Sequence, residues 1–325
     1  MFTRRIFSAG LAATAIAPWV QKSAWAQAYP NRPVRIVLPF AAGGVADVTA
    51  RIVADKLGEK LGQRFVVENQ PGPGGIAAAR AVLGSPADGH TLAMLTNGTA
   101  VSVGLFKSLP FDPLKEFTPI STLGLFDLVV VTNAETKFAT LADFLKAARE
   151  QPGKLNVGTI GVGSTQNLSA ELLKATAGVD FAIIPFRASP DAVVALLRND
   201  VQLVIDIYAA LRAGLSDNKL KAIASTGTAR VGALPSVPTA IEGGIRGYDV
   251  TSWNALYAAA GTPPAIVAQL NGVLREILSD AGLKKRFTAF GIEAKPSTPA
   301  ELDARMRADI AKWGAVIEKA KIPKQ

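Results

Sequence analysis

Short apolar segments of β-strand character alternate with segments of helical periodicity along the chain, and this alternation restricts the fold more than any other feature. The segment 34–40, VRIVLPF, is continuously apolar, as expected of a strand covered on both faces. From Asp47 the apolar residues recur at helical spacing until Gly62 ends the pattern. Further strand patterns follow at 65–69 and 91–96. This order predicts an α/β fold.

A second series of strand and helix patterns opens at residue 126 with FDLVVVTN. Another strand pattern, at 248–264, and two amphipathic helical patterns complete the 325 residues. We expect two α/β domains joined by crossover strands near residues 126 and 250. Lobe 1 comprises 27–125 and 250–325, lobe 2 comprises 126–249, and the C-terminal helices pack back on lobe 1.

The segment 1–26 has the three parts of a secretory signal peptide. Arg4 and Arg5 precede a short apolar stretch, and an A-x-A cleavage pattern ends at Ala26. We expect cleavage after Ala26 and export to the periplasm. The arginine pair with a nearby phenylalanine resembles a twin-arginine signal, and an ordinary secretory signal that carries two arginines is the alternative. The apolar stretch is too short to span a bilayer.

The composition excludes several kinds of site. The chain has no cysteine and one histidine, His90, which excludes disulfides, cysteine nucleophiles and metal cages built from thiolates or several imidazoles. The net charge is +9, but the basic residues are scattered. We interpret the densest cluster, LKKRF at 283–287, as a solvated helix face. We therefore expect no nucleic-acid partner, no metal and no cofactor.

The glycine-rich loops lack the motifs of common enzymes. No P-loop spacing occurs, and the segment 161–166, GVGSTQ, lacks the third glycine of a dinucleotide fingerprint. Ser164 does not lie in a G-x-S-x-G nucleophile elbow. A hydrolase triad would have to use His90, which we interpret as a surface residue of a turn. The sequence predicts a protein without catalytic residues, and a periplasmic enzyme on the same fold is the alternative.

Four junctions between a strand and a helix share one design, in which small residues follow the strand and a helix begins. Small residues let a ligand approach the backbone. A helix N-terminus offers unpaired N–H groups and about half a positive charge, so it binds an anion without lysine or arginine. Facing loops from two lobes would form a cleft at the carboxyl ends of the strands. The four loops are 41–46, 72–75, 97–99 and 161–167.

Two of these loops carry a specific pair of motifs. PFAAGGVADVTAR at 39–51 and ENQPGPGG at 68–75 resemble the PFxxGGxxDxxAR and ENxPGxGG motifs of the Bug receptors, the substrate-binding proteins of tripartite tricarboxylate transport systems. The resemblance continues in family order over nearly the whole chain after the signal peptide. The further matching segments are ADGHTLAMLTNG, LPFDPLKEFTPI, QPGKLNVGTIGVGSTQNLSAELL, LPSVPTAIEGG and AAAGTPPAIVAQLN.

The resemblance implies a two-lobed periplasmic binding protein of type II that closes on its ligand like a flytrap. It implies a small carboxylated ligand held mainly by backbone N–H groups, hydroxyls and ordered water, without a salt bridge. The implied partners are membrane transporter subunits, and we expect a monomer. A signalling ligand-carrier on the same fold is a further alternative.

Position by position, the resemblance implies ligand contacts from both lobes. The implied contacts are Phe40, Ala41, Ala42, Gly43, Gly44, Ala46, Asp47, Asn97, Gly98 and Thr99 in lobe 1, Gly163, Ser164, Thr165, Asn167, Arg187 and Asp206 in lobe 2, and Trp253 near the crossover. The family often has histidine where Asn167 stands, and another pair where Phe186 and Arg187 stand. These departures leave the ligand open among dicarboxylates, tricarboxylates, acidic amino acids and aromatic acids.

Several of these residues have a purely structural alternative. Asp47 can pair with the arginine one helical turn later or complement the helix dipole. Phe40 and Trp253 can belong to the core, and the hydroxyl residues of the second-lobe loop can be plain N-caps. Arg187 can clamp a second carboxylate with two hydrogen bonds or lie on the surface.

Overall fold

The structure is a computed structural model that describes residues 29–325. The predicted signal peptide, its cleavage site and the arginine pair lie outside the described residues. Within residues 29–325, no helix combines the length and the apolar character needed to cross a membrane.

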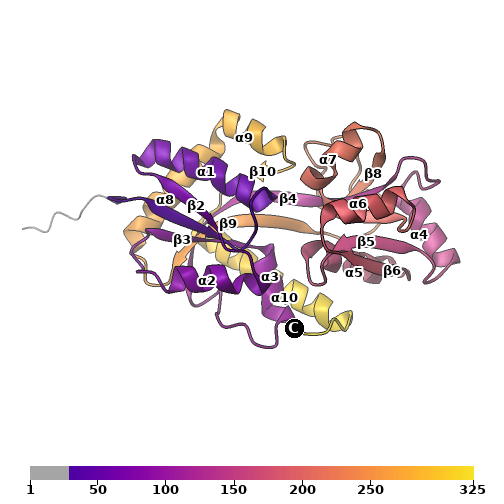
Figure 1. The fold of residues 1–325 in the computed structure, drawn as a ribbon, viewed down its shortest axis with the longest axis horizontal. Coiled ribbons are helices and arrows are strands. Elements are labelled where there is room, and N and C mark those ends of the chain that lie inside the picture. Colours follow the sequence, from indigo (N-terminus) through magenta and orange to yellow (C-terminus); the bar gives the residue numbers. More distant parts are fainter. Residues whose placement is uncertain (1–28) are drawn as a thin grey trace, which may run out of the picture.

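Two α/β lobes lie side by side, and the strands β4 (Phe117–Asn133) and β9 (Thr251–Ala259) extend between them (Figure 1). The first lobe contains a sheet in the strand order β2-β1-β3-β9-β4, with β10 paired to β4. Its strands are β1 (Val34–Leu38), β2 (Phe65–Asn69), β3 (Thr91–Thr96), the first part of β4 (Phe117–Asn133), β9 (Thr251–Ala259) and β10 (Glu293–Ala294). Its helices are α1 (Val45–Leu61), η1 (Pro73–Gly75), α2 (Ile76–Leu83), α3 (Asn97–Leu105), α8 (Pro264–Ser279), α9 (Ala281–Thr288) and α10 (Pro299–Lys319).

The apolar run of β1 is explained by helices on both faces of the first sheet. Ile36 and Leu38 pack in one apolar cluster with residues of α1 and α8, whereas Val37 packs in another with residues of α2. The pairings of β1 with β2 and of β1 with β3 are parallel, and β9 is antiparallel to both of its neighbours. The carboxyl ends of β1 and β3 therefore lie at the same edge, followed by α1 and α3.

The second lobe repeats this arrangement on the other end of β4. Its strand order is β4-β7-β5-β6, and β8 also pairs with β4. Its remaining elements are α4 (Leu141–Glu150), β5 (Asn156–Ile160), α5 (Thr165–Ala177), β6 (Ala182–Phe186), α6 (Ser189–Leu197), β7 (Leu203–Ile207), α7 (Tyr208–Ser216) and β8 (Leu220–Ser225).

The strand β4 belongs to both lobes. Residues 117–127 pair with β9, whereas residues 128–133 pair with β7 and β8, so the partners change between Asp127 and Leu128. The segment that leads back from the second lobe to β9 is hydrogen-bonded at the same place. The Thr226 N–H donates to the Leu128 carbonyl, and the Val250 N–H donates to the Thr226 carbonyl. The lobes are thus joined by neighbouring segments that form a hinge.

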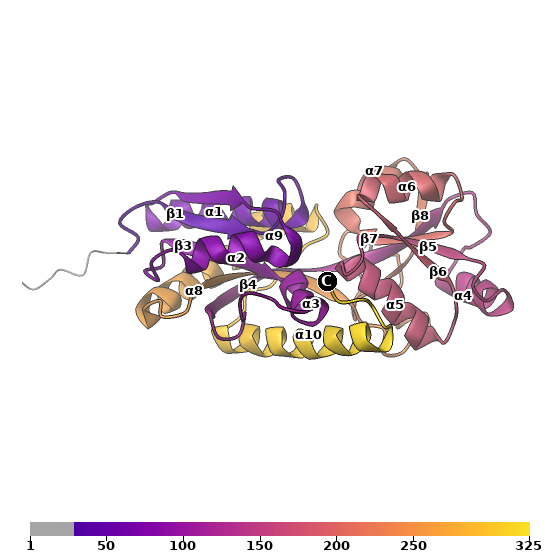
Figure 2. The ribbon, with the colours of Figure 1, turned by 60° about the horizontal axis from the view of Figure 1, so that its bottom comes forward.

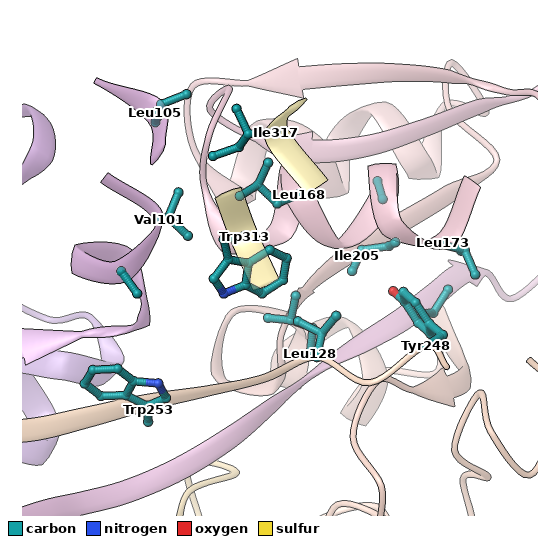
Figure 3. Packing of buried hydrophobic residues seen from close by; sticks show 14 of the residues in the cluster. Val101, Leu105, Leu128, Leu168, Leu173, Ile205, Tyr248, Trp253, Trp313 and Ile317 are labelled. Atoms are coloured by element: carbon teal, nitrogen blue, oxygen red, sulfur yellow. The ribbon is translucent and has the colours of Figure 1, made fainter. Parts of the chain in front are cut away.

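The helix α10 lies along the first lobe and reaches the second (Figure 2). It packs on α3 and β4, and its C-terminal part also contacts α5. Figure 3 shows Trp313 of α10 near Val101 of α3 and Leu168 of α5, and all three belong to one apolar cluster. The C-terminal helix α10 packs on the first lobe as expected, and apolar residues such as Ile317 also extend the shared core toward lobe 2.

Candidate functional site

A cavity of about 330 Å³ lies between the lobes, where both groups of strands end. Its walls come from the loop before α1, the starts of α3 and α5, the hinge strands β4 and β9, and the ends of β5 and β7. The lining residues are Phe40, Gly44, Val45, Ala46, Thr96, Gly98, Phe126, Leu128, Ile160, Ser164, Thr165, Gln166, Ile207, Ser252 and Asn254. This volume is at the small end of the range of roughly 300–1,000 Å³ seen for small-molecule sites.

The N-terminus of α1 opens into this cavity. Gly44 is the N-cap and supplies no side-chain hydrogen bond. In the described chain, no acceptor takes the N–H groups of Val45, Ala46 and Asp47, the first turn of the helix. Gly44, Val45 and Ala46 line the cavity. Because the first N–H groups of a helix have no partner within the helix, these amides are available to an anion.

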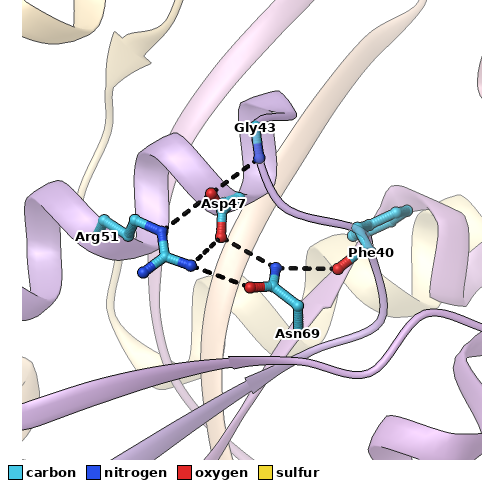
Figure 4. Close-up of polar contacts among 5 residues, drawn as sticks. All are labelled: Phe40, Gly43, Asp47, Arg51 and Asn69. Carbon is cyan, nitrogen blue, oxygen red and sulfur yellow. Dashed lines mark hydrogen bonds and ion pairs between the residues drawn. The ribbon is translucent and has the colours of Figure 1, made fainter.

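Asp47 fixes the shape of this loop and does not line the cavity (Figure 4). Its buried carboxylate accepts hydrogen bonds from the Gly43 N–H at 3.0 Å, from Arg51 Nε at 3.0 Å and from Asn69 Nδ2 at 2.9 Å. Asn69 also donates to the Phe40 carbonyl at 3.0 Å. Burial raises the pKa of Asp47, but the bonds from Arg51, Gly43 and Asn69 outweigh burial, so the pKa lies below its usual value.

The loop before α5 has the same construction in the second lobe. The Gly163 N–H donates to Asn167 Oδ1 at 3.2 Å, as Gly43 donates to Asp47. The hydroxyl of Ser164, the N-cap, accepts from the Asn167 N–H at 3.1 Å. Asn167 donates from its side chain to the Thr159 hydroxyl at 3.3 Å. The first turn of α5 is thereby held with its N-terminus toward the cavity.

The amides of Thr165 and Gln166, at the start of α5, have no acceptor among the described residues. Both residues line the cavity, together with Ser164. Unpaired helix amides from both lobes therefore border one cavity. The helix N-termini offer partial positive charge, and no lysine, arginine or histidine is among the residues that line this cavity.

The two lobes touch beside the cavity. Asn97, the first residue of α3, donates from Nδ2 to the Thr165 hydroxyl at 2.9 Å, and its Oδ1 accepts from Trp313 Nε1 at 2.7 Å. Gly163 approaches Leu105 so closely that a Cβ atom at residue 163 would lie 2.2 Å from Leu105 Cδ2. The start of α5 is thus held directly against α3.

Asp206 lies behind the cavity wall of the second lobe, at the end of β7. Its carboxyl is 1% exposed, and Oδ1 accepts from Gln166 Nε2 at 2.9 Å and from the Ile207 N–H at 2.7 Å. Its Oδ2 is buried and has no hydrogen-bond partner within 3.5 Å. Burial raises the pKa of Asp206, and this effect exceeds the opposing effects of Ser189, Gln166 and the Ile207 amide. Asp206 therefore orients the cavity-lining amide of Gln166.

The structure brings together most of the residues predicted as ligand contacts, in two layers. The predicted residues that line the cavity are Phe40, Gly44, Ala46, Gly98, Ser164 and Thr165. Those that stand behind and hold the lining loops are Gly43, Asp47, Asn97, Thr99, Gly163, Asn167 and Asp206. Ala41 and Ala42 are exposed in the loop before α1.

Trp253 and Arg187 are not brought to the cavity. Trp253 is fully buried in the core, and its Nε1 donates to Asp309 Oδ2 at 2.6 Å, so the predicted pocket contact is replaced by the alternative of core packing. Side chains alternate across a strand, and the cavity is lined by the neighbours of Trp253, Ser252 and Asn254. Arg187 is exposed and outside the lining, as its alternative described.

The lining residues that the sequence did not indicate are of two kinds. Val45, Thr96 and Gln166 are direct neighbours of predicted residues. The others lie on the hinge strands or at strand ends, and only Ser252 and Asn254 have a local signal, the alternation of side chains around Trp253. This second group is Phe126, Leu128, Ile160, Ile207, Ser252 and Asn254.

His90 is buried, which corrects the expectation of a surface residue. It is 6% exposed, its ring packs edge-on against Tyr29 with centroids 5.0 Å apart, and its Nδ1 lies 3.2 Å from Asp88 Oδ1. The chain segment at Tyr29 covers the turn that holds it. Among residues 29–325, no group of three or more metal-ligating side chains is positioned to bind a metal ion.

A second cavity, of about 300 Å³, is lined by residues 125–127, 228–233 and 291–293 among others. Burial raises the pKa of Asp127 in its wall to about 6, although the Thr251 hydroxyl donates to this carboxyl at 2.7 Å. No helix N-terminus is among its lining residues, so it lacks the anion-binding feature of the cavity between the lobes.

Comparison with known proteins identifies the architecture. The model of the tripartite tricarboxylate transporter family receptor matches residues 49–322. The chain belongs to this family. The chain is 32% identical to BugT of Bordetella pertussis over 294 residues, which cover 90% of each protein. These findings show a solute-binding receptor of the Bug type, which serves a transport system.

Solved structures of similar chains agree with this assignment. An R. palustris protein solved with adipate is 32% identical, with a TM-score of 0.81 over 91% of this chain and 99% of the other. MatC from Rhodopseudomonas palustris, solved with bound malate, is 32% identical, with a TM-score of 0.75 over 89% of this chain and all of the other. The predicted two-lobed α/β fold and the predicted receptor family are confirmed.

Proposed function

We propose that this receptor binds a small carboxylate in the cavity between its lobes and delivers it to the membrane subunits of a tripartite tricarboxylate-type transport system. The observation that carries the proposal is the pair of unpaired helix N-termini, of α1 and α5, that border one cavity from opposite lobes. The amides of Val45, Ala46, Thr165 and Gln166 are the donors available to the carboxylate. The relatives solved with adipate and malate bind carboxylates, which supports this choice.

The ligand acts by favouring lobe closure. A carboxylate that accepts hydrogen bonds from both lobes has more partners when the lobes are together, so it shifts the population toward the closed form. We assign residues 27–125 and 250–325 to one moving lobe and residues 126–249 to the other. The proposed receptor is a monomer, exported to the periplasm by a signal peptide that ends at Ala26.

The lining gives no support to an enzyme. No Asp, Glu, His, Lys or Arg is among the residues lining the cavity in the described chain, so no lining side chain is a general base that could activate the serine and threonine hydroxyls there. Asp206 is behind the wall, with one oxygen already occupied by two donors. Capture without conversion is the proposed activity.

A thermal-shift screen of residues 27–325 tests the proposal, with small carboxylates and their neutral amides as matched ligands. A ligand at 100 times its Kd adds about 2.7 kcal/mol to the free energy of unfolding, which is a visible shift in melting temperature. We expect shifts with acids and none with amides. If no acid acts, mass spectrometry of the unfolded protein shows whether a carboxylate was already bound, and its absence contradicts the proposal.

One variant tests the helix N-terminus itself. Ala46→Asp places a carboxylate in the first turn of α1, where negative charge is compatible with the helix dipole, but where it repels a bound anion. We expect at least a tenfold loss of carboxylate affinity in a variant that still unfolds cooperatively. Ala41→Asp, in the same loop but outside the lining, is the matched control. Equal affinities of the two variants would contradict the assignment of the site.

A further inference from the structure

Among the residues that line the cavity, the unpaired helix amides come from α1 and α5. Asn97 at the start of α3 contacts Thr165 at the start of α5. The ring of Phe40, from the loop before α1, lies against the start of α3, 3.9 Å from where a Cβ atom of Gly98 would be. The starts of α1, α3 and α5 therefore lie close together. The unpaired amides of α1 and α5 together form one binding site for a single carboxylate.

The rest of the cavity is largely apolar. Phe126 and Leu128 come from the hinge strand, and Ile160 and Ile207 come from the ends of β5 and β7. The remaining lining side chains away from the helix starts, Ser252 and Asn254, are neutral. Ile207 is also the N-cap of α7, but no residue of that helix is among the lining residues. A second carboxylate in this part would therefore lose its hydration without gaining a cation or a lining helix amide, which is costly.

Charged groups near the cavity do not offset this cost. Arg51, the cation of the α1 loop, is bound to Asp47 and Asn69. Arg187 is exposed and outside the lining. Asp206 is adjacent to Ile207 and hydrogen-bonded to Gln166, and a carboxyl there disfavours a second anion.

The loops at the cavity carry exposed apolar side chains on both lobes. Phe40 is 40% exposed in the loop before α1, and Val162 is 48% exposed in the loop before α5. Large exposed apolar residues on facing loops are suited to cover an apolar ligand when the lobes close.

We infer that the ligand of this receptor is a monocarboxylic acid with an apolar body, such as a small aromatic or aliphatic acid, and that dicarboxylates and tricarboxylates bind more weakly. The inference rests on the proposed carboxylate-binding function. It sets this chain apart from the relatives solved with adipate and malate, which are dicarboxylates.

Calorimetry with matched pairs tests this preference on residues 27–325. Benzoate is compared with terephthalate, and hexanoate with adipate, because each pair differs by one carboxylate on the same skeleton. We expect the monoacid of at least one pair to bind at least tenfold more tightly. Diacids that bind as tightly as their monoacids, or more tightly, would overturn the inference and leave the receptor function standing. If the protein neither binds any acid nor releases one on unfolding, the proposed function itself is contradicted.

A charge placed at the apolar end sharpens the test. Ile160→Lys supplies a cation for a second carboxylate at a half-buried position of the wall, and Ile207→Lys does the same if the first variant does not fold. We expect either variant to shift the monoacid-to-diacid affinity ratio at least tenfold toward the diacid. Leu197→Lys, on an exposed position of α6, controls for net charge. An unchanged ratio in the folded cavity variant would show that the ligand body lies elsewhere and would overturn the inference.

Discussion

The loops before α1 and α5 both leave helix amides unpaired at the cavity, but different side chains hold the two loops in place. In each, a glycine with positive φ, Gly43 at +89° and Gly163 at +78°, donates its N–H to the side chain four residues later. That side chain is the charged Asp47 in the first lobe and the neutral Asn167 in the second. Both arrangements leave the next helix amides unpaired at the cavity.

The difference lies in what surrounds each loop. The Asp47 charge is balanced by Arg51, and the Gly43 backbone has open space around it. The Asn167 loop has no charge to balance, but Gly163 is wedged against Leu105 of the opposite lobe. An electrostatic network thus holds the loop before α1, and close packing holds the loop before α5. Substitutions should therefore destabilise the two loops in different ways.

The largest contrast is expected at the two glycines. Alanine at either position costs about 1–2 kcal/mol for the left-handed backbone. Gly163→Ala adds a clash with Leu105, worth about 1–3 kcal/mol, whereas Gly43→Ala meets nothing within 4 Å. Urea denaturation should therefore show a loss of about 2–5 kcal/mol for Gly163→Ala and about 1–2 kcal/mol for Gly43→Ala.

A double-mutant cycle assigns the excess to the packing contact. Combining Gly163→Ala with Leu105→Ala removes the clash, so the two changes should be non-additive by about 1–3 kcal/mol. Additive losses would show that the contact between Gly163 and Leu105 does not cause the additional loss of stability. They would contradict the role of packing proposed for the loop before α5.

Exchanging the two acceptors is expected to have an intermediate effect that depends on pH. Asp47→Asn leaves Arg51 without its anion and should cost about 1–2 kcal/mol near neutral pH. Because the folded pKa of Asp47 is lowered, its contribution is present above its unfolded pKa of about 4 and is lost as the pH falls through the folded value. Unfolding curves of the variant and the natural protein should converge in acid.

The reverse exchange should have the opposite sign. Asn167→Asp places a carboxylate where no cation is paired with it, so the variant should lose stability as the pH rises and the carboxylate ionises. The same charge beside the α5 amides should weaken carboxylate binding. If Asp47→Asn keeps its full cost at low pH, the network is not electrostatic.

The smallest effects are expected at the N-caps. Ser164→Ala removes a hydroxyl that accepts from the Asn167 N–H and donates to the Ile160 carbonyl, and it should cost about 1 kcal/mol. Gly44→Ser gives α1 the cap that α5 has, at an extended position with open space, and should gain a few tenths of a kcal/mol. Amide hydrogen exchange of the first helical turns is the measurement, and equal protection in both variants would contradict the assigned caps.

Local patterns were sufficient to predict the elements that place these loops. The continuous apolar run of β1 and the glycine junctions follow from short-range sequence, and so does the pairing of Asp47 with Arg51, which was one of two alternatives. What the sequence could not show was which side of a junction residue faces the ligand, because that depends on contacts with distant Asn69 and Thr159.

The hinge was the least predictable part. The sequence pattern predicts a strand from residue 126, but β4 begins at Phe117. Pro119 and Gly124 are unfavourable within strands, and the structure accommodates them at two irregularities in the pairing with β9. The resemblance implied a pocket contact for Trp253, but its neighbours Ser252 and Asn254 face the cavity instead, because a shift of one residue along a strand exchanges its faces.

The hydrogen bond between Trp313 and Asn97 has a spectroscopic consequence. The described residues contain two tryptophans, Trp253 and Trp313, and both indole N–H groups are hydrogen-bonded. Only Trp313 donates to a side chain that itself bridges the lobes, through Thr165. Separation of the lobes frees one end of Asn97 and changes the electric field at that indole, so the intrinsic fluorescence of Trp313 should follow opening and closing without any added label.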